Sequence, residues 1–260
     1  MSVMIGTPIK NCAGWFRRFS HNLDQFTDVS RVILSYGVSD DPTLRVAKEW
    51  AAEAKHKVEI YAEPPMQAMS AAEIAPVYQE FQRMMTEDET HFLLIDSDIA
   101  KTPKNLIQLL KKQKKDIVAP YVWIQGRTPR EFYDCEVFRL GGHRFHPFRP
   151  PKTEGPMQLD SVGSCYLATR EVFLTAQYGN PHPHRVFCND ARERGYEVWA
   201  DPRISIYHLD LPRLGILHYS IESLRKVPAD RSPFIDNAGK TFSFEEMKQD
   251  YSRAYLWGKA

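Results

Sequence analysis

The sequence predicts an α/β protein built on a mostly parallel central sheet that is flanked by helices. Up to residue 121, short apolar runs alternate with stretches of helical composition. Such alternation is typical of βαβ units with right-handed crossovers. A second observation is the wholly apolar run at residues 92–95, which ends abruptly in acidic residues. A run of this kind indicates a strand buried on both faces, as in a parallel sheet. We therefore expect a doubly wound sheet in a single domain.

Eight elements are expected before residue 122. In chain order within each class, the expected strands are residues 3–5, 31–36, 57–61, 92–95 and 116–121, and the expected helices are residues 43–54, 71–85 and 103–115. The apolar residues of the second helix recur close to the helical period. Pro103 suits the first position of the third helix.

The alternation stops at residues 122–158, which are rich in proline, glycine, arginine and aromatic residues and have no clean period. A segment of this length without a pattern is usually functional. Regular elements are expected again after it: a strand at 161–168, a helix from Arg170, a helix at 184–194, a strand at 197–199 and a final helix near 244–257.

Composition excludes several classes of protein. The chain has 260 residues, 43% hydrophobic residues and a net charge of +1, as in an ordinary globular protein. It has no apolar run near the ~20 residues that a membrane helix needs, and no visible secretory signal. Its four cysteines form no CxxC pair, which excludes a zinc knuckle and favours a reducing compartment. We expect a soluble cytoplasmic protein without a membrane anchor, in the host cytoplasm if the chain is viral.

Two carboxylates, Asp96 and Asp98, directly follow the buried strand at residues 92–95. Ligands of open α/β sheets gather at the carboxyl ends of strands, and carboxylates are too costly to bury without a partner. Hard divalent metals take oxygen ligands and often complete their shell with phosphates. The triplet indicates a metal bound to a nucleoside diphosphate. A solvated helix cap is the alternative that the triplet alone leaves open.

The ordered set of motifs resembles that of GT-A fold glycosyltransferases, in particular the mannan-polymerase-type and procollagen-galactosyltransferase-type groups. The set consists of Gly6-Thr7-Pro8, Ser39-Asp40-Asp41, Asp96-Ser97-Asp98, Gly163-Ser164 and a late His208. The likeness covers about residues 1–215. It implies a GT-A catalytic domain at 1–220, comprising a nucleotide-binding half (1–121), an acceptor-side loop region (122–158) and an acceptor and metal half (159–220), with a C-terminal tail (221–260) packed on it.

The resemblance also implies where the donor nucleotide binds. The loops after the first two strands would hold its base and ribose, through Thr7, Pro8, Ser39, Asp40 and Asp41. Turn chemistry alone also accounts for these residue types. Within the acidic triplet, Asp98 would bind the metal directly, and Asp96 would reach the ribose or a metal-bound water, with Ser97 beside it.

A third protein ligand is implied at His208, because GT-A enzymes often use a histidine after the last strand. Here Leu209-Asp210 follows instead of the usual small residue, and His218 is a competing candidate. Imidazole beside carboxylate suits manganese better than magnesium. The expected cofactor is therefore Mn²⁺, or else Mg²⁺, with a nucleoside-diphosphate sugar as donor, UDP being favoured over GDP.

Two further segments carry implied roles. Gly163 and Ser164 would lie under the donor sugar, where glycine allows the backbone close to a ligand; an ordinary bulge is the alternative. Asp190 resembles the acid that acts as general base in inverting members and that positions donor or acceptor in retaining ones. Asn189 replaces the usual first acid, which leaves the stereochemistry open, and a helix N-cap is the other interpretation of Asp190.

Basic and aromatic residues interleave in residues 121–152. The basic ones are Arg127, Arg130, Arg139, Arg144, Arg149 and Lys152. Arginine pairs with phosphate and aromatic rings stack on sugars or bases, so this segment suits a phosphorylated or nucleic-acid acceptor. Packing of the aromatic residues onto the sheet is the alternative.

The expected function is that of a metal-dependent hexosyl or pentosyl transferase that acts on an acceptor hydroxyl. A variant is a glycosyltransferase for hydroxymethylated bases in viral DNA. A different class is a non-catalytic nucleotide-sugar-binding protein or a nucleotidyltransferase, although Gly6-Thr7-Pro8 is not the glycine-rich basic loop that a nucleotidyltransferase needs. The sugar, the acceptor and the oligomeric state stay open.

Overall fold

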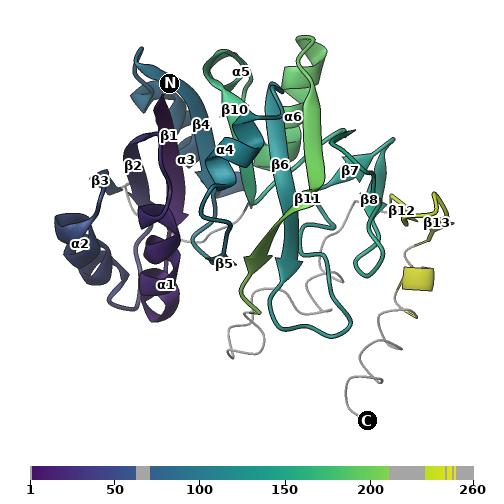
Figure 1. Ribbon diagram of the computed structural model, residues 1–260, viewed down its shortest axis with the longest axis horizontal. Helices are drawn as coiled ribbons and strands as arrows, with labels where there is room; N and C mark the ends of the chain where they lie inside the picture. Colours follow the sequence, from purple (N-terminus) through teal and green to yellow (C-terminus); the bar gives the residue numbers. More distant parts are fainter. Residues whose placement is uncertain (1, 63–70, 211–231, 244, 248, 250–260) are drawn as a thin grey trace.

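A nine-stranded sheet forms the centre of the molecule (Figure 1) within the part that the computed structural model describes, residues 2–62, 71–210, 232–243, 245–247 and 249. Its strand order is β3-β2-β1-β4-β10-β6-β11-β5, and β9 pairs with β11 at the side. Six of these strands pair in parallel, since β3, β2, β1 and β4 run together and β6 runs with β11. Only β10, between β4 and β6, reverses the direction at the centre. The expected mostly parallel α/β fold is confirmed.

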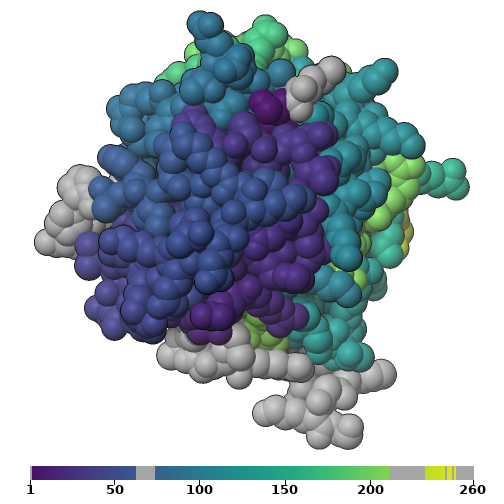
Figure 2. Space-filling view, turned by 60° about the vertical axis from the view of Figure 1, so that its left-hand side comes forward, coloured from purple at the N-terminus to yellow at the C-terminus, as the bar shows by residue number. Residues whose placement is uncertain are grey.

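The first half alternates strands and helices. Its elements are β1 (Ser2–Ile9), α1 (Ala13–Asp24), β2 (Val29–Tyr36), α2 (Thr43–Glu53), β3 (Lys57–Ala62), α3 (Ala71–Met84), β4 (Glu89–Ile95), β5 (Ile99–Lys101), α4 (Leu106–Lys111) and β6 (Ile117–Ile124). Figure 2 views the molecule from the β3 side, where these N-terminal segments form most of the surface.

The second half starts with short strands. Its elements are β7 (Arg139–Leu140), β8 (His143–Phe145), β9 (Met157–Gln158), β10 (Cys165–Thr169), α5 (Arg170–Thr175), α6 (Pro183–Glu193), β11 (Val198–His208), β12 (Phe234–Ile235) and β13 (Thr241–Phe242). Strands β13, β12, β8 and β7 form a second, four-stranded sheet. The final helix expected near residues 244–257 and the competing ligand His218 fall largely or wholly outside the described residues.

Helix α1 was not predicted from the sequence, because its start is stabilised from a distant segment. Its N-cap residue, Cys12, makes no side-chain capping bond. Instead, the N–H of Ala13 donates to Asp41 Oδ2 (2.9 Å) and to Thr43 Oγ1 (3.0 Å). These two side chains follow β2, so the local sequence carries no start signal for the helix.

Several other boundaries also differ from the expected ones. Helix α4, expected at residues 103–115, runs from Leu106 to Lys111 with Asn105 as its N-cap, so Pro103 is not at its first position. Strand β1 continues through Ile9, so Thr7 and Pro8 lie within the strand and not in a turn after it. Strand β11 extends from Val198 to His208 because it pairs in parallel with β6 across a register shift after Asp201. The strand expected at residues 161–168 begins only at Cys165, after a residue with positive φ, Ser164 (50°).

Strand β4 is buried on both faces, as its apolar sequence predicted. Phe92 and Leu94 point into one apolar cluster, which also contains buried residues of α3, α5 and α6. Leu93 and Ile95 point into the other, which contains buried residues of α1, α2 and α4. At Gly6, on the neighbouring strand, a Cβ atom would lie 2.6 Å from the Phe92 ring. Only glycine therefore lets β1 and the ring pack this closely.

Aromatic side chains from residues 121–145 form a packed core cluster. Phe132 meets the rings of Tyr121, Trp123 and Phe138 edge-on, with centroids 5.0–5.7 Å apart, an arrangement that stabilises ring pairs. All four side chains are buried. The aromatic residues of this segment thus pack onto the sheet, the alternative that the sequence left open.

No helix among the described residues is long and apolar enough to cross a membrane.

A mostly buried ion-pair network joins residues near the starts of three strands. Arg31 of β2 donates to Glu89 of β4 (2.8 Å) and to Glu59 of β3 (3.1 Å), and Glu89 is 1% exposed. Burial acts to raise the pKa of Glu89, but the hydrogen bonds from Arg31, Thr86 and Ser30 outweigh it and hold the pKa below its usual value. The network therefore stabilises the fold at neutral pH, and its contribution is lost as the pH falls through this lowered pKa.

Replacing Glu89 with alanine is expected to lower the free energy of unfolding by about 3–5 kcal/mol, because it leaves the mostly buried Arg31 without its main partner. Urea unfolding measures this change. Glu49→Ala is the control, since Glu49 makes an exposed (i, i+4) pair with Arg45 and should cost less than about 1 kcal/mol. Equal losses in the two variants would show that the network contributes no more than a surface pair.

Candidate active site

Three chain segments meet at the carboxyl end of β4. The N–H of Asp96, just after β4, donates to the carbonyl of Ser164, just before β10 (2.9 Å). The carbonyl of Asp98 accepts from the N–H of Leu209, just after β11 (2.9 Å). These backbone bonds bring together Asp96, Asp98, Ser164 and His208, which lie far apart in the sequence.

His208 and Asp98 form a close pair. His208 Nε2 lies 2.9 Å from Asp98 Oδ2, and the imidazole is 1% exposed. His208 Nδ1 lies 2.7 Å from the Leu209 carbonyl. A carbonyl can only accept, so Nδ1 carries the proton and Nε2 faces the carboxylate. The Tyr133 ring stacks on the imidazole at 3.5 Å and 16°. Burial would lower the pKa of His208, but the Asp98 carboxylate outweighs it and raises the pKa.

Asp134 is a further member of this cluster that sequence reasoning missed. It is 4% exposed, and its Oδ1 accepts a hydrogen bond from Ser164 Oγ (2.7 Å). Burial raises the pKa of Asp134 to about 7. Burial, followed by the charges of Asp98 and Asp134, also raises the pKa of Asp96. Asp134 lies in the segment without periodicity, at no recognisable spacing from the acidic triplet, so no sequence pattern pointed to it.

The cluster contains buried polar atoms that fit a cation. Asp98 Oδ1, Asp134 Oδ2 and His208 Nε2 are buried without a hydrogen-bond partner of good geometry. Within the described ranges, no three acidic, histidine or cysteine side chains already converge as a complete metal site. Oxygen and imidazole donors in this number suit a divalent ion whose remaining ligands are phosphates and water. We take Asp98 and His208, with Asp96 and Asp134 beside them, as the residues that could hold such an ion.

The loops after β1 and β2 reach the same end of the sheet. Trp15 Nε1 of α1 donates to the carbonyl of Ser97 (3.1 Å), which ties the start of α1 to the acidic triplet. Thr7 is fully buried, and its Oγ1 has no hydrogen-bond partner; Pro8, beside it in β1, is also buried.

In the loop after β2, the side chains of Ser39, Asp40 and Asp41 differ in their hydrogen bonds and exposure. Ser39 Oγ accepts from the N–H of Asn11 (3.0 Å), and Asp41 holds the start of α1. Asp40 is exposed. The loop after β2 thus packs against the start of α1, whose Trp15 contacts Ser97, and Asp41 has a definite structural role there.

Asp190 lies away from the cluster. It belongs to the last turn of α6, and its carboxylate accepts from the N–H of Gln177 (2.8 Å) and from Arg194 Nε (2.8 Å). Gln177 follows α5, which starts where Thr169 pairs with His91 near the amino end of β4. Asp190 is therefore near the opposite end of the sheet, and it is not the N-cap of a helix. The hydrogen bond from Arg194 is the main reason why its pKa is lowered.

The start of α6, by contrast, faces the segment before β10. A Cβ atom on Gly163 would lie 2.8 Å from Val137 Cγ1 and 3.4 Å from His184 Cδ2, so the protein itself occupies the space beside this glycine. His184 is 7% exposed; its Nδ1 has no partner, and its Nε2 lies 3.4 Å from Tyr78 Oη. Burial lowers the pKa of His184 to about 3, which keeps the imidazole neutral. Sequence reasoning did not select this residue.

Several arginines of residues 122–152 pair within the protein. Arg127 makes bonds of 2.6 and 2.7 Å to the two carboxylate oxygens of Asp210. Arg144 is 2% exposed and donates to Glu136 at 3.0 Å. The Arg130 guanidinium lies 3.8 Å above the Trp123 ring. These interactions fix the segment against the domain.

Neither a protein-family model nor a curated protein matches the sequence, but solved structures match the fold. TarS from S. aureus has a TM-score of 0.56 at 11% identity, over 82% of this chain and 37% of TarS. The mannosyltransferase PcManGT from Pyrobaculum calidifontis, solved with GDP-Man and Mn²⁺, has a TM-score of 0.57 at 13% identity, over 82% and 58%. GalNAc-T7, solved with UDP, GalNAc and Mn²⁺, has a TM-score of 0.57 at 12% identity, over 80% and 43%.

These three proteins are GT-A glycosyltransferases, and the chain spans 37–58% of their lengths. At such low identity the shared property is the arrangement of strands and helices. The chain therefore has the GT-A fold, as its ordered motifs implied.

Proposed function

We propose that the chain is a metal-dependent glycosyltransferase that moves a sugar from a nucleoside-diphosphate sugar to an acceptor hydroxyl. The observation that carries this proposal is the pair formed by the buried His208 and the partly exposed Asp98, beside Asp96 and Asp134. It lies at the carboxyl ends of the central strands, where ligands of such sheets bind. Its buried polar atoms without partners suit a cation, and the GT-A fold supports the same reading.

The residues of the cluster have distinct parts in this mechanism. Asp98 and His208 would hold the ion, which when bound supplies Lewis-acid stabilisation of the departing diphosphate. The Leu209 carbonyl and the Tyr133 ring fix the imidazole so that Nε2 faces the site. Ser164 holds Asp134 through its hydroxyl and Asp96 through its carbonyl. This shell keeps the carboxylates oriented before the donor binds.

For the donor, we propose a nucleoside-diphosphate sugar held by Thr7, Pro8, Ser39 and Asp40, with Asp41 shaping the loop. TarS has been solved with UDP-GlcNAc and PcManGT with GDP-Man, so both nucleotides occur on this fold. We favour UDP, and Mn²⁺ over Mg²⁺ because imidazole is a ligand.

The DNA-modifying alternative was motivated by the basic and aromatic residues of the 122–152 segment and by the expected absence of a membrane anchor. We do not favour it, because Arg127 and Arg144 of this segment are engaged with Asp210 and Glu136. A nucleotide-sugar-binding protein without turnover would share the fold and the cluster. Release of free sugar or transfer from a nucleotide sugar would distinguish the enzyme from it. A cytoplasmic location stays a prediction from the sequence.

Asp98→Asn is expected to weaken manganese-dependent UDP binding by about 100-fold or more, because it removes a charged ligand from the ion that bridges protein and diphosphate. Isothermal titration calorimetry with UDP, with Mn²⁺ and then with EDTA, measures this change. The control is Asp88→Asn, an exposed acid ahead of β4, which should bind as the wild type does. Metal-dependent binding that survives in Asp98→Asn would refute the metal assignment.

We further infer that Asp190 is structural, because Gln177 and Arg194 already engage its carboxylate. Asp190→Asn should keep its specific activity and lower the melting temperature, because it weakens the bonds to Gln177 and Arg194. Steady-state kinetics and thermal unfolding of this variant and the wild type test this. Loss of turnover at an unchanged melting temperature would restore Asp190 as the candidate general base.

A further inference from the structure

Arg127 joins two distant chain segments beside the candidate metal site. Its Nε and Nη2 donate to the two carboxylate oxygens of Asp210 (2.6 and 2.7 Å), and its Nη1 donates to Glu131 (2.9 Å). Asp210 follows β11, whereas Arg127 and Glu131 belong to the turn after β6, 83 residues earlier in the chain. A two-point bond between guanidinium and carboxylate fixes orientation as well as distance. We call these three residues the Arg127 clamp.

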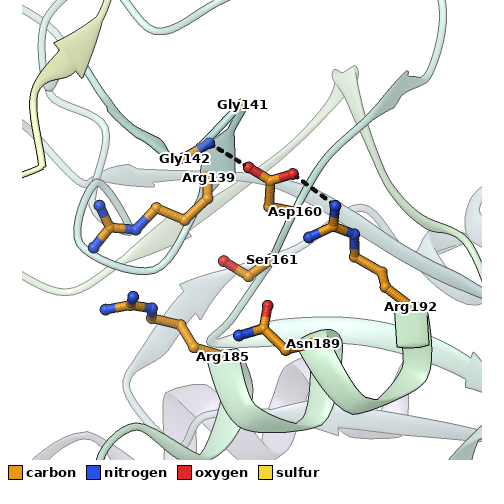
Figure 3. A pocket seen from close by; sticks show the side chains of 8 residues that line it. All are labelled: Arg139, Gly141, Gly142, Asp160, Ser161, Arg185, Asn189 and Arg192. Atoms are coloured by element: carbon orange, nitrogen blue, oxygen red, sulfur yellow. Dashed lines mark hydrogen bonds and ion pairs between the residues drawn. The ribbon is translucent and has the colours of Figure 1, made fainter. Parts of the chain in front are cut away.

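The Arg127 clamp is largely shielded from water. The side chains of Arg127, Glu131 and Asp210 are 12%, 5% and 6% exposed. The pair of Arg192 and Asp160, at the hollow beside α6 (Figure 3), is different, because Arg192 is 44% exposed. Exposed pairs contribute little to stability, whereas breaking a buried pair leaves a charge without compensation. The clamp therefore holds its two segments more firmly than a surface pair would.

The turn that contains Arg127 is bonded directly to His208. The N–H of Gln125 donates to the His208 carbonyl (2.8 Å). Further along the same segment, the Tyr133 ring stacks on the imidazole, with ring centroids 3.5 Å apart. The segment on one side of the clamp thus contacts both the backbone and the ring of His208.

The other side of the clamp continues from His208 itself. Asp210 lies two residues beyond it, and Leu209 stands between them. The Leu209 N–H donates to the Asp98 carbonyl (2.9 Å), and the Leu209 carbonyl accepts from His208 Nδ1 (2.7 Å). By holding Asp210, the clamp therefore also holds the backbone carbonyl that orients the imidazole.

We propose that Arg127 is a positioning residue for the candidate metal site, because its clamp on Asp210 holds the His208 imidazole in a single orientation. The consequence for metal binding rests on the proposed transferase function. The orientation of the imidazole is a property of the chain alone, and it is measured without metal or donor.

Proton NMR of the full chain in EDTA measures this orientation. A stacked ring shifts protons above its face upfield, so the His208 ring protons of the wild type should be displaced upfield by Tyr133; His208→Gln identifies their signals. Arg127→Met keeps the bulk of the side chain and removes every donor, and the displacement should be largely lost. Asp210→Asn, on the other side of the clamp, should reduce it in the same direction.

Arg31→Met is the matched control. Arg31 also holds two carboxylates, those of Glu89 and Glu59 (2.8 and 3.1 Å), and is 11% exposed, but it lies near the amino end of β4, away from His208. This variant should keep the His208 displacement at a temperature where circular dichroism shows both variants folded. The lysine variants of both arginines, which keep the charge and lose the two-point bond, give the same comparison if a methionine variant does not fold.

An unchanged His208 signal in Arg127→Met, or an equal loss in the Arg31 control, would overturn the proposal. UDP binding with Mn²⁺, measured by calorimetry on the same proteins, should weaken by about 10–100-fold in Arg127→Met, the usual effect of losing a contact that orients a metal ligand. Arg127→Lys should lose less, and Arg31→Met should bind normally.

The two measurements separate the two proposals. If the wild type binds no UDP with Mn²⁺, the transferase function fails, while the His208 spectra still decide whether Arg127 positions the imidazole. If the imidazole moves in Arg127→Met and UDP binding does not change, the positioning role in metal binding is overturned and the transferase function stands.

Discussion

The contact between Asp98 and His208 is the interaction on which the candidate site depends. It joins the residues after β4 to the end of β11, two strands that are separated in the sheet by β10 and β6. The imidazole of His208 is 1% exposed and needs a polar partner, which the 23% exposed Asp98 carboxylate supplies. The backbone bond between Asp98 and Leu209 supplies the geometry that makes them partners. The rest of the cluster is arranged around this link, since Ser164 then brings Asp134 and Asp96 to the same edge.

The sequence predicted those features whose cause is local. The apolar run of β4 predicted that the strand is buried on both faces. The acidic residues after it predicted a polar site at its carboxyl end. His208 could be proposed because a resemblance supplied its position. Asp98 and His208 lie 2.9 Å apart with Asp96 beside them, and their role as metal ligands stays a prediction.

Features with a distant cause were not predictable. Helix α1 begins where Asp41 and Thr43 satisfy its first N–H groups, and these residues follow a different strand. Asp134 is linked to the acidic cluster by its hydrogen bond with Ser164, which is 30 residues away in the sequence. The arginines of residues 122–152 looked available in sequence because their partners, such as Asp210, are remote in the chain. Asp190 shows the converse case: its neighbours in sequence resemble a motif, but its neighbours in space are Gln177 and Arg194.

The two ends of β4 carry acidic residues with different surroundings. Glu89, its first residue, belongs to the ion-pair network with Arg31, and Asp96 follows its last residue. Six residues lie between them, a strand rise of roughly 23 Å, and the four that precede Asp96, residues 92–95, are all apolar. Beyond a screening length of about 8 Å in physiological salt, charges at the two ends interact weakly. Selection can therefore adjust the thermal tolerance of the protein at one end of this strand while leaving the chemistry at the other end unaltered.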